Sequence, residues 1–82
     1  MGSILVVDDE PSIRITVRAF LEADGHIVET AEDAESAMAA LRKHPMDVVL
    51  TDVILPRVSG VDLLRQIREI SPHVQVIMMT CT

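Results

Sequence analysis

The residues with the clearest chemical potential are carboxylates that follow apolar segments. Asp8 and Asp9 come directly after the apolar residues 4–7, and Asp52 comes after a second segment rich in valine and leucine. In open parallel sheets, ligands bind beyond the carboxyl ends of the strands, at the point where the strand order reverses. If the two segments are neighbouring strands, the three carboxylates converge on one crevice. Because clustered like charges repel one another, we expect them to share a cation, and Mg²⁺ prefers oxygen ligands.

The spacing of apolar residues indicates the elements that hold these carboxylates. Residues 3–7 form a short, continuously apolar strand pattern, typical of a central strand covered on both faces. Pro11 suits a first helical turn, and Gly25 suits a left-handed cap at the end of that helix. The apolar stripe of this helix consists of Ile13, Val17, Phe20 and Leu21. Residues 26–30 then predict a second, less buried strand.

The middle of the chain repeats this alternation of helix and strand. A second helical stripe has acidic residues before it and basic residues after it, which complements the helix dipole. Its members are Ala34, Ala37, Met38 and Leu41. Pro45 ends this helix, and residues 46–51 predict a third strand that leads into Asp52. Residues 53–59 predict a loop.

A third helix and a fourth strand complete the pattern. The helix follows Gly60, and its apolar residues are Val61, Leu63, Leu64, Ile67 and Ile70. Residues 74–79 predict the fourth strand, which leads to Thr80. Strict alternation of strands and helices indicates right-handed βαβ units that build a parallel sheet, so we predict a three-layer α/β fold. We expect residues 1–82 to form a single, incomplete domain, because nothing in the sequence covers the fourth strand.

Composition and charge narrow the range of functions. Apolar residues make up 49% of the chain, and thirteen Asp and Glu against seven Lys and Arg give a net charge of −6. Such a charge repels a phosphate backbone, so we expect no direct binding of nucleic acid. No apolar run approaches the roughly 20 residues that a membrane span needs. A single cysteine, Cys81, excludes an internal disulfide, and in the absence of a secretory signal we expect a cytoplasmic protein.

Several motifs, in this order, resemble those of the receiver domains of two-component response regulators. They are the apolar strand that ends in Asp8 and Asp9, Asp52 with Leu55, Pro56 and Gly60 behind it, and the apolar segment that ends in Thr80. An acidic pair alone is weak evidence, and so is any spacing of Asp, Pro and Gly, whereas the ordered set is specific. The resemblance covers residues 4–82, and it implies a flavodoxin-like, doubly wound parallel sheet in the strand order 2-1-3-4.

The resemblance implies a phosphoacceptor. Asp52 would accept a phosphoryl group from a phosphohistidine of a sensor histidine kinase or a phosphotransfer protein. Asp9 would bind Mg²⁺ directly beside Asp52, Asp8 would help through water, and the backbone carbonyl of Ile54 would complete the metal site. Thr80 would donate its hydroxyl to the phosphoryl group and act as a switch. A stoichiometric acceptor of this kind is not an enzyme.

The same resemblance identifies residues 1–82 as a single partial receiver domain. Family members continue through a further helix, strand and helix, which carry a lysine and an aromatic switch residue. Neither stands in this sequence, whose one lysine, Lys43, lies at the end of the second predicted helix. The family also tunes access of the hydrolytic water two positions after the acceptor, so an apolar Ile54 indicates slow loss of the phosphoryl group.

The sequence leaves other functions open. Haloacid-dehalogenase-type phosphatases also use a strand-end aspartate with Mg²⁺, but they place a second aspartate where this chain has Ile54. A further alternative is a phosphorylation-incompetent interaction module, which self-associates as a homodimer through the uncovered fourth strand. The individual residues also have simpler roles: Asp8 and Asp9 as charges before a helix, Asp52 as a turn residue and Thr80 as a strand former.

Overall fold

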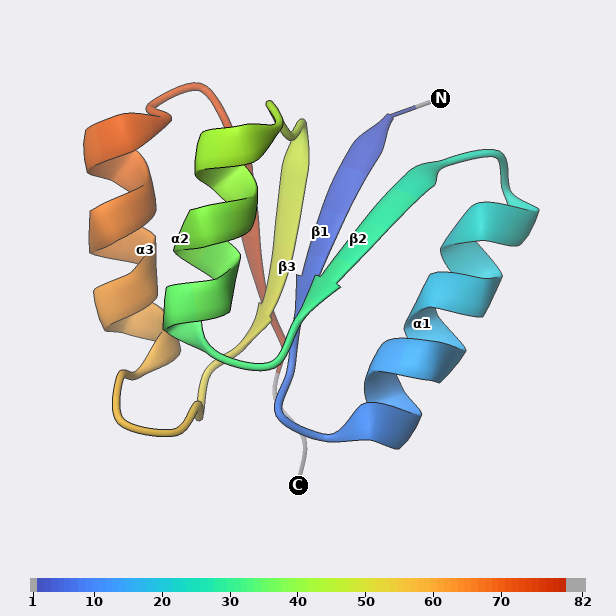
Figure 1. Ribbon diagram of the computed structural model, residues 1–82, viewed down its shortest axis with the longest axis horizontal. Helices are drawn as coiled ribbons and strands as arrows, with labels where there is room; N and C mark the ends of the chain where they lie inside the picture. Colours follow the sequence, from blue (N-terminus) through green and yellow to red (C-terminus); the bar gives the residue numbers. More distant parts are fainter. Residues whose placement is uncertain (1, 80–82) are drawn as a thin grey trace.

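Within residues 2–79, which the computed structural model describes, four parallel strands and three helices form three layers (Figure 1). The elements are β1 (Ser3–Val7), α1 (Pro11–Ala23), β2 (Ile27–Ala31), α2 (Ala34–Lys43), β3 (Val48–Asp52), α3 (Gly60–Ile70) and β4 (Gln75–Met79). The strand order is β2-β1-β3-β4. The predicted α/β class and strand order are therefore confirmed. Helix α1 covers one face of the sheet, and α2 and α3 cover the other.

Three of the strands begin later than the sequence pattern predicts. They cover residues 27–31, 48–52 and 75–79, where the pattern predicted 26–30, 46–51 and 74–79. Two of these strands begin beside Asp47, whose N–H donates to the Ser3 carbonyl at 2.8 Å and whose carbonyl accepts from Gln75 at 3.1 Å. Pairing of β3 with β4 starts only after that link. Asp52 is consequently the last residue of β3 rather than the first residue after it.

The face beneath α2 and α3 holds the main core. The predicted stripe of α2 is buried throughout, at Ala34, Ala37, Met38 and Leu41. From α3, Leu63 and Ile67 are buried against the sheet. The other predicted core residues of α3 are less covered, and Val61 and Ile70 are 47% and 43% exposed. Val61 lies two residues before Leu63 and so about 200° away around the helix, whereas Ile70 is the last helical residue.

The face beneath α1 is thinner. Its buried residues are Ile4, Val6 and Val28 of the sheet. Helix α1 has no buried residue of its own, although Val17 and Leu21 pack partly buried against the sheet. Phe20, predicted in the same stripe, is 74% exposed. It follows Val17 by three residues and so lies about 60° away from it around the helix. Phe20 is therefore at the rim of the stripe, where residues 2–79 leave it largely exposed.

Polar side chains and one glycine fix the helix ends. Glu10, Asp33 and Ser59 accept hydrogen bonds from the backbone N–H groups of Ser12, Ser36 and Asp62. Gly25 has φ +90°, which confirms the predicted left-handed turn after α1. Within residues 2–79, none of the helices has the length and the apolar character that crossing a membrane requires.

Candidate metal centre

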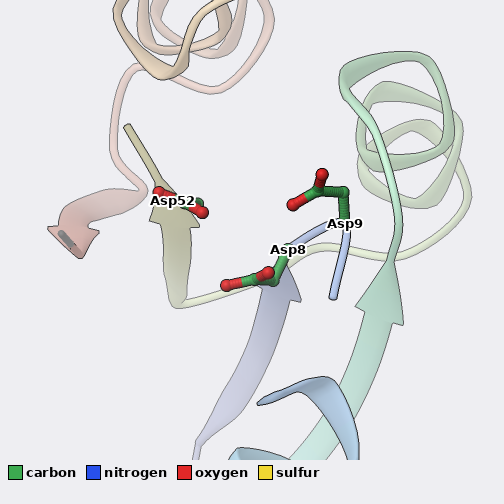
Figure 2. Close-up of side chains that lie close together, drawn as sticks. All are labelled: Asp8, Asp9 and Asp52. Carbon is green, nitrogen blue, oxygen red and sulfur yellow. The ribbon is translucent and has the colours of Figure 1, made fainter. Parts of the chain in front are cut away.

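Three carboxylates gather at the carboxyl end of the sheet (Figure 2). β1 and β3 are neighbouring parallel strands, so their last residues lie at the same edge. Asp8 and Asp9 directly follow β1, and Asp52 ends β3. One oxygen from each of the three carboxylates lies within 4.8 Å of the others. The convergence that the sequence predicts is therefore present.

Asp8 holds the innermost position. The residue is 0% exposed, and its Oδ1 accepts a hydrogen bond from the Glu10 N–H at 2.9 Å. Its Oδ2 is also buried and accepts no hydrogen bond from residues 2–79. A buried carboxylate oxygen without a partner is costly, and a bound cation removes that cost. The donor atoms around it are carboxylate oxygens, which suit a hard divalent ion such as Mg²⁺.

Arg14 is a cationic side chain that forms a hydrogen bond to the cluster of Asp8, Asp9 and Asp52. Its Nη1 donates to the backbone carbonyl of Asp8 at 2.6 Å. Arg14 is half-buried, and its contact ties α1 to the end of β1. This hydrogen bond fixes the turn that carries Asp8 and Asp9. Because its acceptor is a main-chain carbonyl, it leaves the carboxylate oxygens of the cluster without a bond from Arg14. The sequence offers one indication of this contact: Arg14 follows Asp8 by six residues, which places it in the first turns of α1.

Asp52 is positioned by the turn that follows it. The residue is 8% exposed, and its Oδ1 accepts from the Ile54 N–H at 3.1 Å. Gly60, the first residue of α3, donates its N–H to the Val53 carbonyl at 2.8 Å. A Cβ atom on Gly60 would lie 2.5 Å from the Asp52 carbonyl oxygen and 3.0 Å from the Val53 Cα. Glycine is therefore required here for close approach of α3, a role that the sequence marked only as the start of a helix.

The remaining predicted site residues differ in their surroundings. Asp9 is exposed, so the cluster opens to solvent on its side. The Ile54 side chain is 76% exposed, two residues beyond Asp52. Leu55 is 8% exposed and packs in the main core, and this packing anchors the turn between Asp52 and α3. Thr80 lies outside the described residues 2–79.

Comparison with known proteins matches this arrangement to a family. The family model described as the response regulator receiver domain covers residues 4–82. The chain belongs to the response regulator receiver domain family. The resemblance drawn from the motifs is therefore confirmed, and it agrees with the parallel sheet and the acidic cluster at its edge.

Named relatives and solved receivers agree with this assignment. The chain is 42% identical over 78 residues to the probable transcriptional regulatory protein TcrX of Mycobacterium tuberculosis, covering 95% of this chain and 33% of the relative. A receiver domain protein from Clostridium thermocellum has a TM-score of 0.92 and 39% identity over 98% of this chain and 65% of that one. The response regulator TrrA of Thermotoga maritima, solved in complex with Mg²⁺ and BeF, has a TM-score of 0.92 and 34% identity over 100% of this chain and 71% of that one.

The match defines what the chain shares with these proteins. It spans about a third of the length of the curated relatives it matches, namely 33%, 30% and 39% of the first three. The shared part is a receiver domain of a two-component response regulator, and an acidic pocket at the sheet edge is consistent with a phosphoacceptor role.

Proposed function

We propose that Asp52 accepts a phosphoryl group from a phosphohistidine of a sensor histidine kinase or a phosphotransfer protein. An Asp52 carboxylate oxygen attacks phosphorus, an O–P bond forms and the N–P bond breaks. The electron pair of that bond returns to the imidazole nitrogen, which takes up a proton. Each chain accepts one group, so it acts as a stoichiometric acceptor and not as an enzyme. The observation that supports the proposal is a largely buried carboxylate with two others within 4.8 Å of it.

The geometry of Asp52 supports its role as the nucleophile. Oδ1 is occupied by the Ile54 N–H at 3.1 Å, which leaves Oδ2 for attack. The turn cannot move away easily, because Gly60 packs against the Asp52 carbonyl and Leu55 is buried in the core. Positioning of this kind supplies much of the rate in phosphoryl transfer.

Asp8, Asp9 and Asp52 are the proposed ligands of Mg²⁺, Asp8 through water, with the backbone carbonyl of Ile54 as a further ligand. The unpartnered buried Oδ2 of Asp8 supports this assignment. A bound Mg²⁺ neutralises the charge that develops on the phosphoryl oxygens during transfer. Asp8 and Asp9 hold their carboxylates beside the acceptor through the tight turn after β1, which the Glu10 N–H and Arg14 fix.

Incubation with acetyl phosphate and Mg²⁺ tests the acceptor role. We expect intact-mass measurement to show one added phosphate on the parent and none on Asp52→Asn. Asp24→Asn is a matched control, because Asp24 caps the far end of α1 and its side chain is 84% exposed. Sustained release of inorganic phosphate over many turnovers would instead favour the phosphatase alternative. Modification of Asp52→Asn equal to that of the parent would contradict the proposal.

Thermal unfolding with and without Mg²⁺ tests the metal site separately. A ligand that binds only the folded state at a hundredfold excess over its Kd adds about 2.7 kcal/mol to the free energy of unfolding. We expect a rise in Tm for the parent and for Asp24→Ala, and a smaller rise for Asp9→Ala. A Tm that ignores Mg²⁺ in all three proteins would remove the metal site from the proposal.

The exposed Ile54 side chain supports slow hydrolysis of the acyl phosphate. An apolar group that is 76% exposed beside the acceptor neither orients nor activates a water molecule. We expect Ile54→Asn to shorten the half-life of the phosphorylated chain, because an amide can position the attacking water. Equal half-lives in the two proteins would rule this role out.

Thr80 is the proposed switch hydroxyl, and the support for it comes from the sequence motif alone. Thr80→Ala is expected to take up phosphate on Asp52 as the parent does. The change in amide exchange that phosphorylation causes in the parent should be reduced in this variant. An undiminished change would exclude Thr80 as the switch.

Self-association through β4 is a second candidate function. β4 is an outer strand of the described sheet, and Ile77 on it is 49% exposed. Unpaired strand edges with exposed apolar side chains favour pairing with another chain. We expect the 82-residue chain to sediment as a dimer at high concentration and Ile77→Glu to restore the monomer. Ile27→Glu on the opposite outer strand, at a site 58% exposed, is the matched control. A parent that stays monomeric removes this candidate.

A further inference from the structure

A groove runs along β2, the other outer strand of the described sheet. Its volume is about 510 Å³, and it is lined by Arg18 of α1, by Val28, Glu29 and Thr30 of β2, and by Lys43 of α2, among others. β2 and β4 lie at opposite edges of the sheet. A strand paired with β4 would therefore lie at the other edge of the sheet from this groove. Figure 1 shows β2 flanked by α1 on one face and α2 on the other.

The backbone of β2 directs two residues into this groove. The Ile27 N–H donates to Gly2 at 2.9 Å, and the Ala31 carbonyl accepts from Asp8 at 3.0 Å, so both residues face the β1 side. Successive residues of a strand direct their N–H and C=O groups to opposite sides. Val28 and Thr30 therefore direct theirs away from β1, and both residues line the groove. Such an unpaired edge is a template for an added strand.

The walls of the groove allow a backbone to approach. On the α2 side they include Ala39 and Ala40, whose side chains are short. β2 is five residues long, which corresponds to a strand of about 17 Å. An extended segment of similar length therefore matches the edge.

Charge identifies the kind of segment that fits. The chain carries seven Lys and Arg and a net charge of −6. Arg18, Lys43 and the acidic Glu29 line the groove, whereas the adjoining hollow on the α1 side, beside Thr30, is lined by Arg14 and Arg18 and by no acidic residue of the described chain. Arg18 pairs with Glu22 at 3.2 Å, but both side chains are about half exposed, so the pair is weak. The α1 side of the β2 edge is therefore basic and attracts carboxylates, while Glu29 keeps the α2 side from doing so.

Glu29 places a buried carboxylate oxygen that lacks a hydrogen-bond donor inside the groove. Its Oε2 is buried and accepts no hydrogen bond from residues 2–79, while its Oε1 lies 3.8 Å from the His44 Nε2. Glu29 pairs in register with Leu5 of the α2 face, whereas Thr30 pairs with Val6 of the α1 face. A strand added here would place a hydroxyl side chain near Glu29 and carboxylates on alternate residues toward the arginines. The hydroxyl would satisfy the buried oxygen.

We propose that the β2 edge binds an extended acidic polypeptide segment as a fifth parallel or antiparallel strand. Its main chain pairs with Val28 and Thr30, its carboxylates face Arg14 and Arg18 on the α1 side, and a serine or threonine hydroxyl faces Glu29. Main-chain pairing supplies affinity, and the alternating side chains supply specificity. The segment does not contact Asp52, and it shares with the candidate metal centre only Arg14, which also donates to the Asp8 carbonyl.

A capped heptapeptide of alternating threonine and glutamate is the probe, and a threonine–lysine peptide of the same length is its control. We expect the acidic peptide to slow amide exchange at Val28 and Thr30 but not at Glu29, whose N–H faces β1. We expect the basic peptide to bind at least about tenfold more weakly, and the difference to shrink at high salt. Equal binding of the two peptides, no binding of either, or protection confined to β4 would overturn the proposal.

Charge reversals on the chain provide the second measurement. Arg18→Glu and Lys43→Glu are each expected to weaken binding of the acidic peptide by about threefold to tenfold. Arg65→Glu makes the same charge change on α3, where the side chain is 77% exposed, and should leave the affinity unchanged. Equal losses in all three variants would reduce the effect to net charge and contradict a site at β2. Protection of Val28 and Thr30 that grows with protein concentration without peptide would assign the edge to a second copy instead.

Discussion

The two faces of the sheet are closed to very different extents. Under α2 and α3, both helices contribute fully buried side chains, including Leu63 and Ile67 at 0% exposure. Under α1, the buried residues come only from the strands, and α1 itself contributes partly buried ones such as Val17 and Leu21. The first face is a packed core, whereas the second is a helix resting on a sheet.

This difference bears on how the candidate metal centre is held. The turn after Asp52 is anchored in the closed face, through Leu55 in the core and Gly60 against the main chain. Asp8 follows the central strand β1, and α1 contributes the hydrogen bond of Arg14 to its carbonyl. The rigid face therefore positions the acceptor, and the thin face contributes to the turn that carries Asp8 and Asp9.

Truncation of a core leucine should give the largest contrast between the faces. Leu63→Ala leaves a cavity at a fully buried position, and we expect it to lower the free energy of unfolding by about 2–5 kcal/mol. Leu21→Ala makes the same change on α1 at a partly buried position and should cost about half as much or less, since less apolar surface returns to water. Urea denaturation of both variants gives the two values. Similar losses would show that the α1 face is as tightly closed as the other.

Substitution of Gly60, where α3 packs against the turn after Asp52, should give the next largest effect on the free energy of unfolding. In Gly60→Ala the new Cβ meets the Asp52 carbonyl oxygen at 2.5 Å, so main-chain atoms must shift, at a cost of about 1–3 kcal/mol. Since that shift moves Asp52, we also expect weaker Mg²⁺ stabilisation.

Gly25→Ala is the control for this substitution. Its φ of +90° is unfavourable for alanine, yet no atom lies within 4 Å of the new Cβ. We expect a loss of about 1–2 kcal/mol from backbone strain and an unchanged Mg²⁺ response. If both glycine variants responded to Mg²⁺ as the parent does, Gly60 would have no part in placing Asp52.

The sequence predicted the elements of this fold because each carried a local signal. Continuous apolar runs gave β1 and β3, and the α2 stripe was correct at every position because acidic and basic residues also marked its ends. The alternation of strands and helices gave the parallel α/β class, whereas the strand order came from the resemblance to receiver domains. The convergence of Asp8, Asp9 and Asp52 then followed from the shared edge of neighbouring parallel strands.

Features that depend on packing between distant segments were not predictable in the same way. Phe20 fits the apolar spacing of α1, but its exposure depends on how far the strands extend beneath that helix. The start of β3 is set by where its pairing with β1 and β4 begins, next to the main-chain bonds of Asp47 to Ser3 and Gln75, and such pairing has no local pattern. The need for glycine at position 60 likewise arises only when α3 closes on Asp52.

Phe20 tests how open the α1 face is. A buried phenylalanine loses about 3–5 kcal/mol on truncation to alanine. At 74% exposure, Phe20→Ala should instead change the free energy of unfolding by less than about 0.5 kcal/mol. Urea denaturation of the variant at low protein concentration measures this without a contribution from association. A loss above about 2 kcal/mol would mean that another group covers this face.

The helix cap at Asp33 should give the smallest effect, and one that depends on pH. Hydrogen bonds from the backbone N–H and side chain of Ser36 lower the pKa of Asp33 below its ordinary value of 3.8, and the charge of Arg57 acts in the same direction. Because the folded-state pKa is depressed, this stabilisation is fully present above the unfolded value and is lost as the pH falls through the folded one. Asn caps helices about as well as Asp, so Asp33→Asn should change stability by less than about 0.5 kcal/mol at pH 7.

Below pH 4 the parent should lose this contribution, whereas Asp33→Asn keeps its neutral cap, so the two stability curves should approach each other or cross. Thermal unfolding from pH 7 to pH 2.5 measures both curves. Asp24→Asn provides the control, because Asp24 lies beyond the last turn of α1 and its side chain is 84% exposed; its curve should run parallel to that of the parent. If the stability curve of Asp33→Asn also ran parallel to that of the parent, the charge of Asp33 would not contribute to holding α2 on the closed face.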